Sequence, residues 1–104
     1  MIIQLNSDKN IQVTEKLEAF VSEKINHALK RFAGKITRVE VHLSDQNAGK
    51  AGADDMQCRI EARMKDLQPV TVTARNSTKE KAMADAIDKI KAALDSAAGK
   101  LSSK

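Results

Sequence analysis

Apolar residues recur at steps of three and four over two long segments, which predicts two amphipathic helices. The first helix runs from Thr14, which can cap it, to about Phe32, and Gly34 can end it. The second runs from Ser77 to Leu101, with Ser77 as N-cap and Glu80 completing a capping box. The apolar stripes are Leu17, Phe20, Val21, Ile25, Ala28, Leu29 and Phe32, and then Met83, Ala86, Ile87, Ile90, Leu94, Ala97 and Leu101.

Four shorter segments have the alternation or the β-branched residues typical of strands. They are residues 1–6, 36–43, 56–65 and 70–75. In the second, Thr37, Val39, Val41 and Leu43 share the apolar face. In the third, Met56, Cys58, Ile60, Ala62 and Met64 alternate with polar residues, and in the fourth Val70, Val72 and Ala74 point inward. Asp66–Pro69 is the predicted hairpin turn.

These elements predict an α+β fold with the order β-α-β-β-β-α in a single domain, residues 1–104. Each helix has one apolar stripe and the last three strands have one apolar face, so we expect two layers: a four-stranded sheet with both helices on one face. The first strand should pair parallel to a neighbour through the first helix. Residues 44–55 lack periodicity and contain Gly49 and Gly52, which indicates a loop within the domain.

The amino-acid composition limits the classes of function that fit this chain. Aromatic residues make up only 2% of the chain, which argues against recognition of single strands by base stacking. The net charge of +4 is compatible with a nucleic-acid partner and equally with an ordinary soluble protein. Cys58 is the only cysteine, and neither a signal peptide nor a membrane span is apparent. These features predict a cytoplasmic protein.

No pattern typical of catalysis is present. His27 and His42 lie in different elements without a second ligand at metal-site spacing, and Cys58 is in phase with buried residues. Gly49 and Gly52 do not form a phosphate-binding motif. We therefore expect no enzyme activity, no cofactor, no metal and no small-molecule substrate.

The positive charge is concentrated in the second half of the chain. Residues 56–76 hold four basic and two acidic side chains, and residues 77–104 hold six and four. Outward-facing arginines and helix lysines can simply keep the surface solvated. They can also contact a phosphate backbone, where Lys and Arg supply affinity without reading bases.

The element order adds a family resemblance. The α-β-β-β-α core is that of double-stranded RNA-binding domains. With its extra first strand, the chain resembles the ribosome hibernation-promoting factor family, also known as ribosome-associated inhibitor A or sigma-factor modulation proteins. The likeness covers nearly the whole chain. It rests on Leu17-x-x-Phe20-Val21-x-x-Lys24-Ile25, on Val39-x-Val41-x-Leu43, and on Met83-x-x-Ala86-Ile87-Asp88.

The resemblance implies a short-form bacterial hibernation factor. Such proteins bind the small ribosomal subunit and its RNA and inhibit translation during stress, without a membrane partner. A monomer is favoured. The implied RNA-binding residues include Lys24, Lys30 and Lys100 by position, with His27 where the family often has lysine. Arg31, Lys79, Lys81, Lys89 and Lys91 are further basic candidates on the helices.

The chain also departs from the family pattern. Ala84 replaces a common tyrosine, and Ala93 and Ser96 stand where the family usually has basic residues. Two alternatives therefore stay open. One is a general binder of double-stranded RNA, and the other is a protein-interaction module of the same fold with weakened RNA binding.

Overall fold

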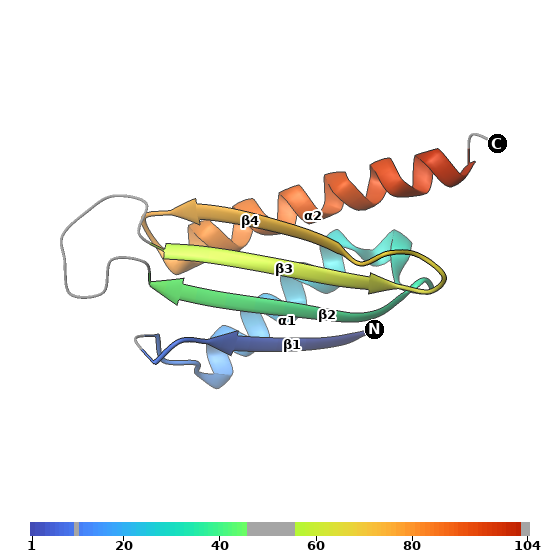
Figure 1. The fold of residues 1–104 in the computed structure, drawn as a ribbon. Helices are drawn as coiled ribbons and strands as arrows, with labels where there is room; N and C mark the ends of the chain where they lie inside the picture. The colour runs from blue at the N-terminus through green and yellow to red at the C-terminus, as the bar shows by residue number, and fades with distance from the viewer. Residues whose placement is uncertain (10, 46–55, 103–104) are drawn as a thin grey trace.

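A computed structural model describes residues 1–9, 11–45 and 56–102, with side chains up to residue 97. It contains one four-stranded sheet in the order β1-β2-β3-β4, with both helices packed against the same face (Figure 1). β1 pairs parallel to β2, and the other pairs are antiparallel. The elements are β1 (Ile2–Ser7), α1 (Glu15–Ala28), the 3-10 turn η1 (Lys30–Phe32), β2 (Ile36–Asp45), β3 (Met56–Met64), β4 (Val70–Asn76) and α2 (Lys79–Ser102).

The predicted β-α-β-β-β-α order, the parallel first pair and the two-layer arrangement are confirmed. Most of the predicted loop, residues 46–55, lies outside the described residues. Asp66 in the β3–β4 turn has a φ of 64°, a left-handed conformation that aspartate tolerates better than most residues. β3 and β4 pair antiparallel across this turn, so the predicted hairpin is confirmed.

The core lies between the helices and the inward face of the sheet. Ile25 of α1, Ile60 of β3 and Ile90 of α2 are completely buried in one cluster. Full burial of each such side chain contributes about 1.5–3 kcal/mol. The predicted stripes are confirmed where side chains are described, although Phe20, Ala28 and Ala97 are only partly buried. Ile11, in the connection between β1 and α1, also joins the core.

The inward position of Thr37 was predicted wrongly. Ile36 is buried and Thr37 is exposed, because the β2–β3 register shifts between Ile36 and Arg38. Such a bulge puts one extra residue into a strand and reverses the alternation on one side of it. The Thr37 hydroxyl donates to the carbonyl of Arg63 at 3.1 Å.

The helix caps were predicted correctly for α1 only. The Thr14 hydroxyl accepts from the amide of Leu17 at 3.1 Å. In α2, Thr78 rather than Ser77 is the cap: its hydroxyl accepts from the amide of Lys81 at 3.1 Å. The predicted capping box with Glu80 is therefore wrong. The Ser77 hydroxyl instead lies 3.3 Å from Oδ1 of Asn76.

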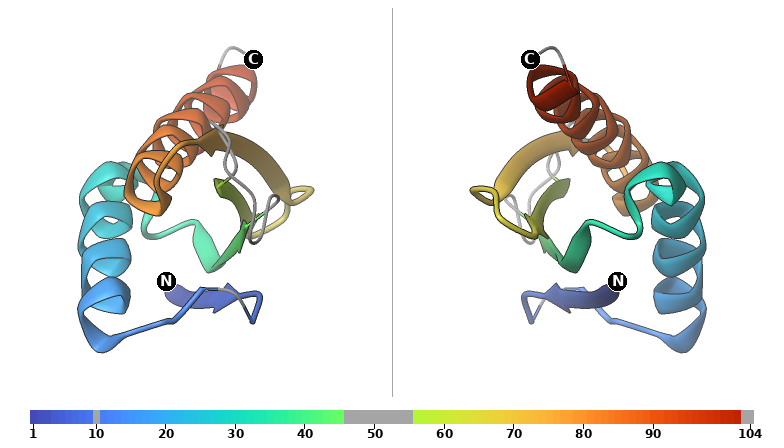
Figure 2. Two further views of the ribbon diagram at one scale, coloured as in Figure 1. Left: turned by 90° about the vertical axis from the view of Figure 1, so that its left-hand side faces the viewer. Right: turned by 90° about the vertical axis from the view of Figure 1, so that its right-hand side faces the viewer.

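The first α-helix ends earlier than predicted and is followed by a 3-10 turn. The α-helix stops at Ala28, and the chain continues as η1, which still buries Phe32. The fold thus has two exposed surfaces that could meet a partner. One is the outer side of the two helices, and the other is the sheet face that no helix covers (Figure 2).

Candidate nucleic-acid interface

The predicted basic residues of the first helix lie at the surface, beyond the apolar stripe. Lys24, His27, Lys30 and Arg31 are all exposed. The ammonium of Lys24 lies 5.7 Å from the centre of the Phe20 ring, and the guanidinium of Arg31 lies 5.3 Å from that of Phe32. Contacts of this kind orient a cation over an aromatic face without removing its charge.

The four described lysines of α2 do not form one stripe. Lys89 and Lys91 are two residues apart and therefore project from nearly opposite sides of the helix. Nζ of Lys89 donates to the carbonyl of Thr73 in β4 at 2.9 Å, whereas Lys79 lies 3.9 Å from Glu80. Lys81 and Lys91 are exposed. The side chain of Lys100 lies outside the described part of the chain.

Acidic residues offset much of the positive charge of the helical layer. Nη1 of Arg31 lies 3.2 Å from Oδ1 of Asp95, which joins η1 to α2. Over residues 79–97, α2 carries four lysines against Glu80, Asp85, Asp88 and Asp95. The structure therefore places those predicted residues whose side chains it describes on one layer, but it does not bring these side chains together in a continuous basic band.

A groove between the starts of the two helices includes a basic residue that the sequence prediction missed. The groove has a volume of about 320 Å³ and is lined by Thr14, Lys16, Leu17, Phe20, Lys79 and Glu80. Lys16 precedes Phe20 by four residues, so both lie on the same side of α1. That spacing could have identified Lys16 as a residue on the same side of α1 as Lys24, which follows Phe20 by four residues.

The open sheet face also carries charge, and part of this charge is internally paired. Nε of Arg38 donates to Oε2 of Glu40 at 2.9 Å, and the same guanidinium contacts Gln4. The hydrogen bond from Arg38 lowers the pKa of Glu40. On β3, Arg63 lies 3.7 Å from Glu61. Together these residues form a surface of two arginines and two glutamates.

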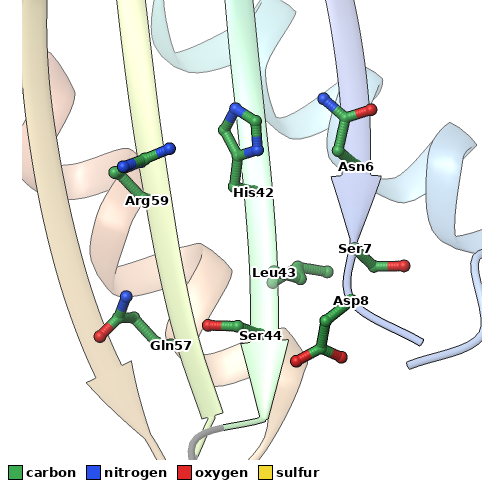
Figure 3. A pocket seen from close by; sticks show the side chains of 8 residues that line it. All are labelled: Asn6, Ser7, Asp8, His42, Leu43, Ser44, Gln57 and Arg59. Carbon is green, nitrogen blue, oxygen red and sulfur yellow. The ribbon is translucent and has the colours of Figure 1, made fainter. Parts of the chain in front are cut away.

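Next to this surface lies a depression of about 350 Å³ at the end of the sheet where β2 finishes. Figure 3 shows its lining side chains: Asn6, Ser7, Asp8, His42, Leu43, Ser44, Gln57 and Arg59. His42 and Arg59 stand directly opposite each other on β2 and β3. None of these residues was among the predicted RNA contacts, although the alternation of β3 predicted that Arg59 faces outward.

The structure also bears on the reactivity of Cys58, on metal binding and on membrane insertion. Cys58 is buried, and burial raises the pKa of its thiol to about 12, so the thiolate is scarce at neutral pH. Within the described ranges, no three His, Cys, Asp or Glu side chains gather in a way that could hold a metal ion. Among the described helices, none combines the length and apolar character needed to cross a membrane.

Comparison with known proteins supports the resemblance seen in the sequence. The profile of the family described as sigma 54 modulation protein / S30EA ribosomal protein matches residues 5–102. The match extends from within β1 to the end of α2. A search of curated proteins found no match.

Two solved structures share the fold. One is the protein Y N-terminal domain of Thermus thermophilus, with a TM-score of 0.72, 21% identity and coverage of 90% of this chain and 96% of that one. The other is a ribosomal subunit interface protein of Coxiella burnetii, with a TM-score of 0.72, 13% identity and coverage of 95% and 99%. At these identities the likeness concerns the fold alone.

Proposed function

We propose that this chain, which belongs to the sigma 54 modulation protein / S30EA ribosomal protein family, associates with the ribosome and restrains translation. The observation that carries the proposal is the family match over residues 5–102, which includes both helices, the end of β1 and the three other strands. The description of the Coxiella burnetii structure as a ribosomal subunit interface protein supports it.

The partner surface is ribosomal RNA of the small subunit, contacted through phosphate groups. Lys30, Lys81 and Lys91 are exposed, and none of them forms a salt bridge with another described residue. Lys24 is exposed and oriented by Phe20. Such side chains supply affinity that depends on salt and not on base sequence, which suits binding to folded RNA.

Sedimentation with purified ribosomes at low and moderate salt tests the proposal. The protein should travel with the small subunit at low salt and dissociate as salt rises. If it stays at the top of the gradient even at low salt, ribosome association is excluded. Excess free RNA duplex added to the same sample separates this function from general binding of double-stranded RNA, which predicts efficient competition.

The variant Lys24→Ala tests whether α1 contacts RNA, and Lys35→Ala is the matched control. Both lysines are exposed and each variant loses one charge, but Lys35 lies in the connection before β2. Lys24→Ala should lower the slope of log affinity against log salt by about one unit, and Lys35→Ala should not. Equal slopes for both variants would exclude Lys24 as a specific contact.

The second candidate is a protein-interaction module, favoured by the charge balance of α2. Over residues 79–97, the charges of its four lysines are balanced by those of four acidic residues, and Asp95 pairs with Arg31 of η1. This function predicts that the partner recovered from a lysate survives treatment with ribonuclease. Recovery that depends on intact RNA would favour ribosome association instead.

A further inference from the structure

The strand register sorts the outward side chains of the open sheet face into rows across the sheet. Arg38 lies opposite Arg63, and Glu40 lies opposite Glu61. The next row in the same direction places His42 opposite Arg59, and Arg59 opposite Thr73. The row after that contains Ser44, Gln57 and Arg75. Like charges thus face each other across strands, and opposite charges follow each other along them.

The first two rows balance their own charge. Arg38 binds Glu40 at 2.9 Å, and Arg63 lies 3.7 Å from Glu61. Each carboxylate of this face therefore has an arginine of its own strand beside it. A second arginine nearby gains little from the same carboxylates, because their charge is already partly compensated.

The arginines of the last two rows lack this compensation, although Nε2 of His42 in the same rows lies 3.6 Å from Oε1 of Glu40. Arg59 and Arg75 are exposed, and neither forms a salt bridge with another described residue. We define the donor half as Asn6, His42, Ser44, Gln57, Arg59, Thr73 and Arg75. Apart from the two arginines, these are amide, hydroxyl and imidazole side chains, which can all donate hydrogen bonds.

The depression in Figure 3 gives the donor half a concave centre. His42, Gln57 and Arg59 contribute to its lining. A second hollow of about 150 Å³ lies beside it and is again lined by His42 and Arg59, with Glu61 and Thr71. Asp8, which follows β1, also lines the first depression, and its Oδ2 accepts a hydrogen bond from the amide of Asp45 at 3.0 Å.

We propose that the donor half is a second phosphate-binding surface, which contacts the backbone of RNA through Arg59, Arg75 and the donors between them. The charge complementarity is local: arginines without a salt bridge to a described carboxylate stand among hydrogen-bond donors, and RNA backbone presents one anionic oxygen pair per nucleotide. The proposal rests on the proposed function and deepens it.

The position of this surface has a direct geometric consequence. It lies on the sheet face opposite the two helices (Figure 2). A chain that uses the helices and the donor half together contacts RNA from two sides. It therefore requires two RNA segments that flank it, and a single isolated duplex can engage only one of its surfaces.

Arg59→Gln and Arg63→Gln form a matched pair for testing. Both change an exposed arginine on the outer face of β3, four residues apart, and only Arg63 has a carboxylate partner. Arg59→Gln should weaken binding to the small subunit about eightfold at about 0.1 M salt and lower the salt slope by about one unit. Arg63→Gln should change both values much less. Thermal melting confirms that both variants are folded.

The outcomes separate the two proposals. If wild-type protein binds the subunit and both variants bind like wild type, or weaken equally, the donor half is excluded and ribosome association stands. If wild-type protein does not bind, ribosome association itself fails.

Amide chemical shifts identify the source of the phosphate. A short RNA duplex should shift the amides of Gln57 and Arg59 at concentrations where inorganic phosphate has no effect. Saturation by inorganic phosphate, with no response to RNA, would overturn the assignment to RNA backbone.

Discussion

Nη1 of Arg31 lies 3.2 Å from Oδ1 of Asp95, so a basic residue predicted to contact RNA is held by an acidic residue of the other helix. The Arg31 side chain remains largely exposed, at 74%. The ion pair therefore adds little to stability, at most about 1 kcal/mol. Its main effect is on the charge that the helical layer presents to a polyanion.

Asp95→Asn should consequently strengthen binding to the ribosome at low salt while it hardly changes stability. The substitution frees Arg31 and removes one negative charge, and we expect a gain of about threefold or more. Asp88→Asn is the control, because Asp88 is an exposed α2 carboxylate without a salt bridge among the described residues. Equal gains for both variants would mean that only net charge matters, and that the pair with Arg31 does not.

The N-cap of α2 makes a prediction about stability. Thr78→Ala removes the hydroxyl that accepts from the amide of Lys81, which should lower the free energy of unfolding by about 0.5–2 kcal/mol. Ser77→Ala should cost much less, because the Ser77 hydroxyl accepts no helix amide. Urea denaturation of the two variants measures the difference. A larger loss for Ser77→Ala would contradict the observed cap.

Cys58 should be almost unreactive in the folded protein. Its thiol is buried, and its pKa of about 12 leaves little thiolate below that pH. Modification by a thiol reagent at about pH 8 should therefore follow unfolding and accelerate sharply when denaturant is added. Rapid modification of the native protein, at the rate of a free thiol, would be incompatible with this burial.

Glu40 should contribute to the acid sensitivity of the fold. The hydrogen bond from Arg38 lowers its pKa in the folded state below the usual 4.5. A lowered carboxyl pKa stabilises the folded state above the unfolded pKa, and this contribution disappears as the pH falls through the folded pKa. The melting temperature of wild type should therefore decline more than that of Glu40→Gln between about pH 6 and pH 3. Identical declines would show that the carboxylate adds no stability.

The elements of the fold were predictable because their periodicity is regular. Met56, Cys58 and Ile60 alternate without interruption, and β3 follows that alternation closely. Thr37 was assigned to the wrong face because a bulge adds a residue to the strand without any signal in the apolar pattern. Ser77 and Thr78 are adjacent hydroxyl residues, and local pattern does not decide which of them the helix uses.

The candidate site was less predictable, because its properties depend on contacts between distant parts of the chain. Sequence spacing showed that Lys24, Arg31 and the α2 lysines are basic and outward-facing. It could not show that Asp95 pairs with Arg31. Alternation likewise predicted that Arg59 and Arg63 face outward. Only the structure shows that they differ, because Glu61, which lies between them on β3, pairs with Arg63 at 3.7 Å and forms no salt bridge with Arg59.

The bond from Lys89 to the Thr73 carbonyl has a consequence for self-association. β4 is an edge strand, and edge strands offer backbone groups to which another chain can add a strand. Nζ of Lys89 occupies one of these acceptors at 2.9 Å and brings a charge to the edge. A lysine at this position therefore discourages sheet extension between molecules and works against aggregation through this edge.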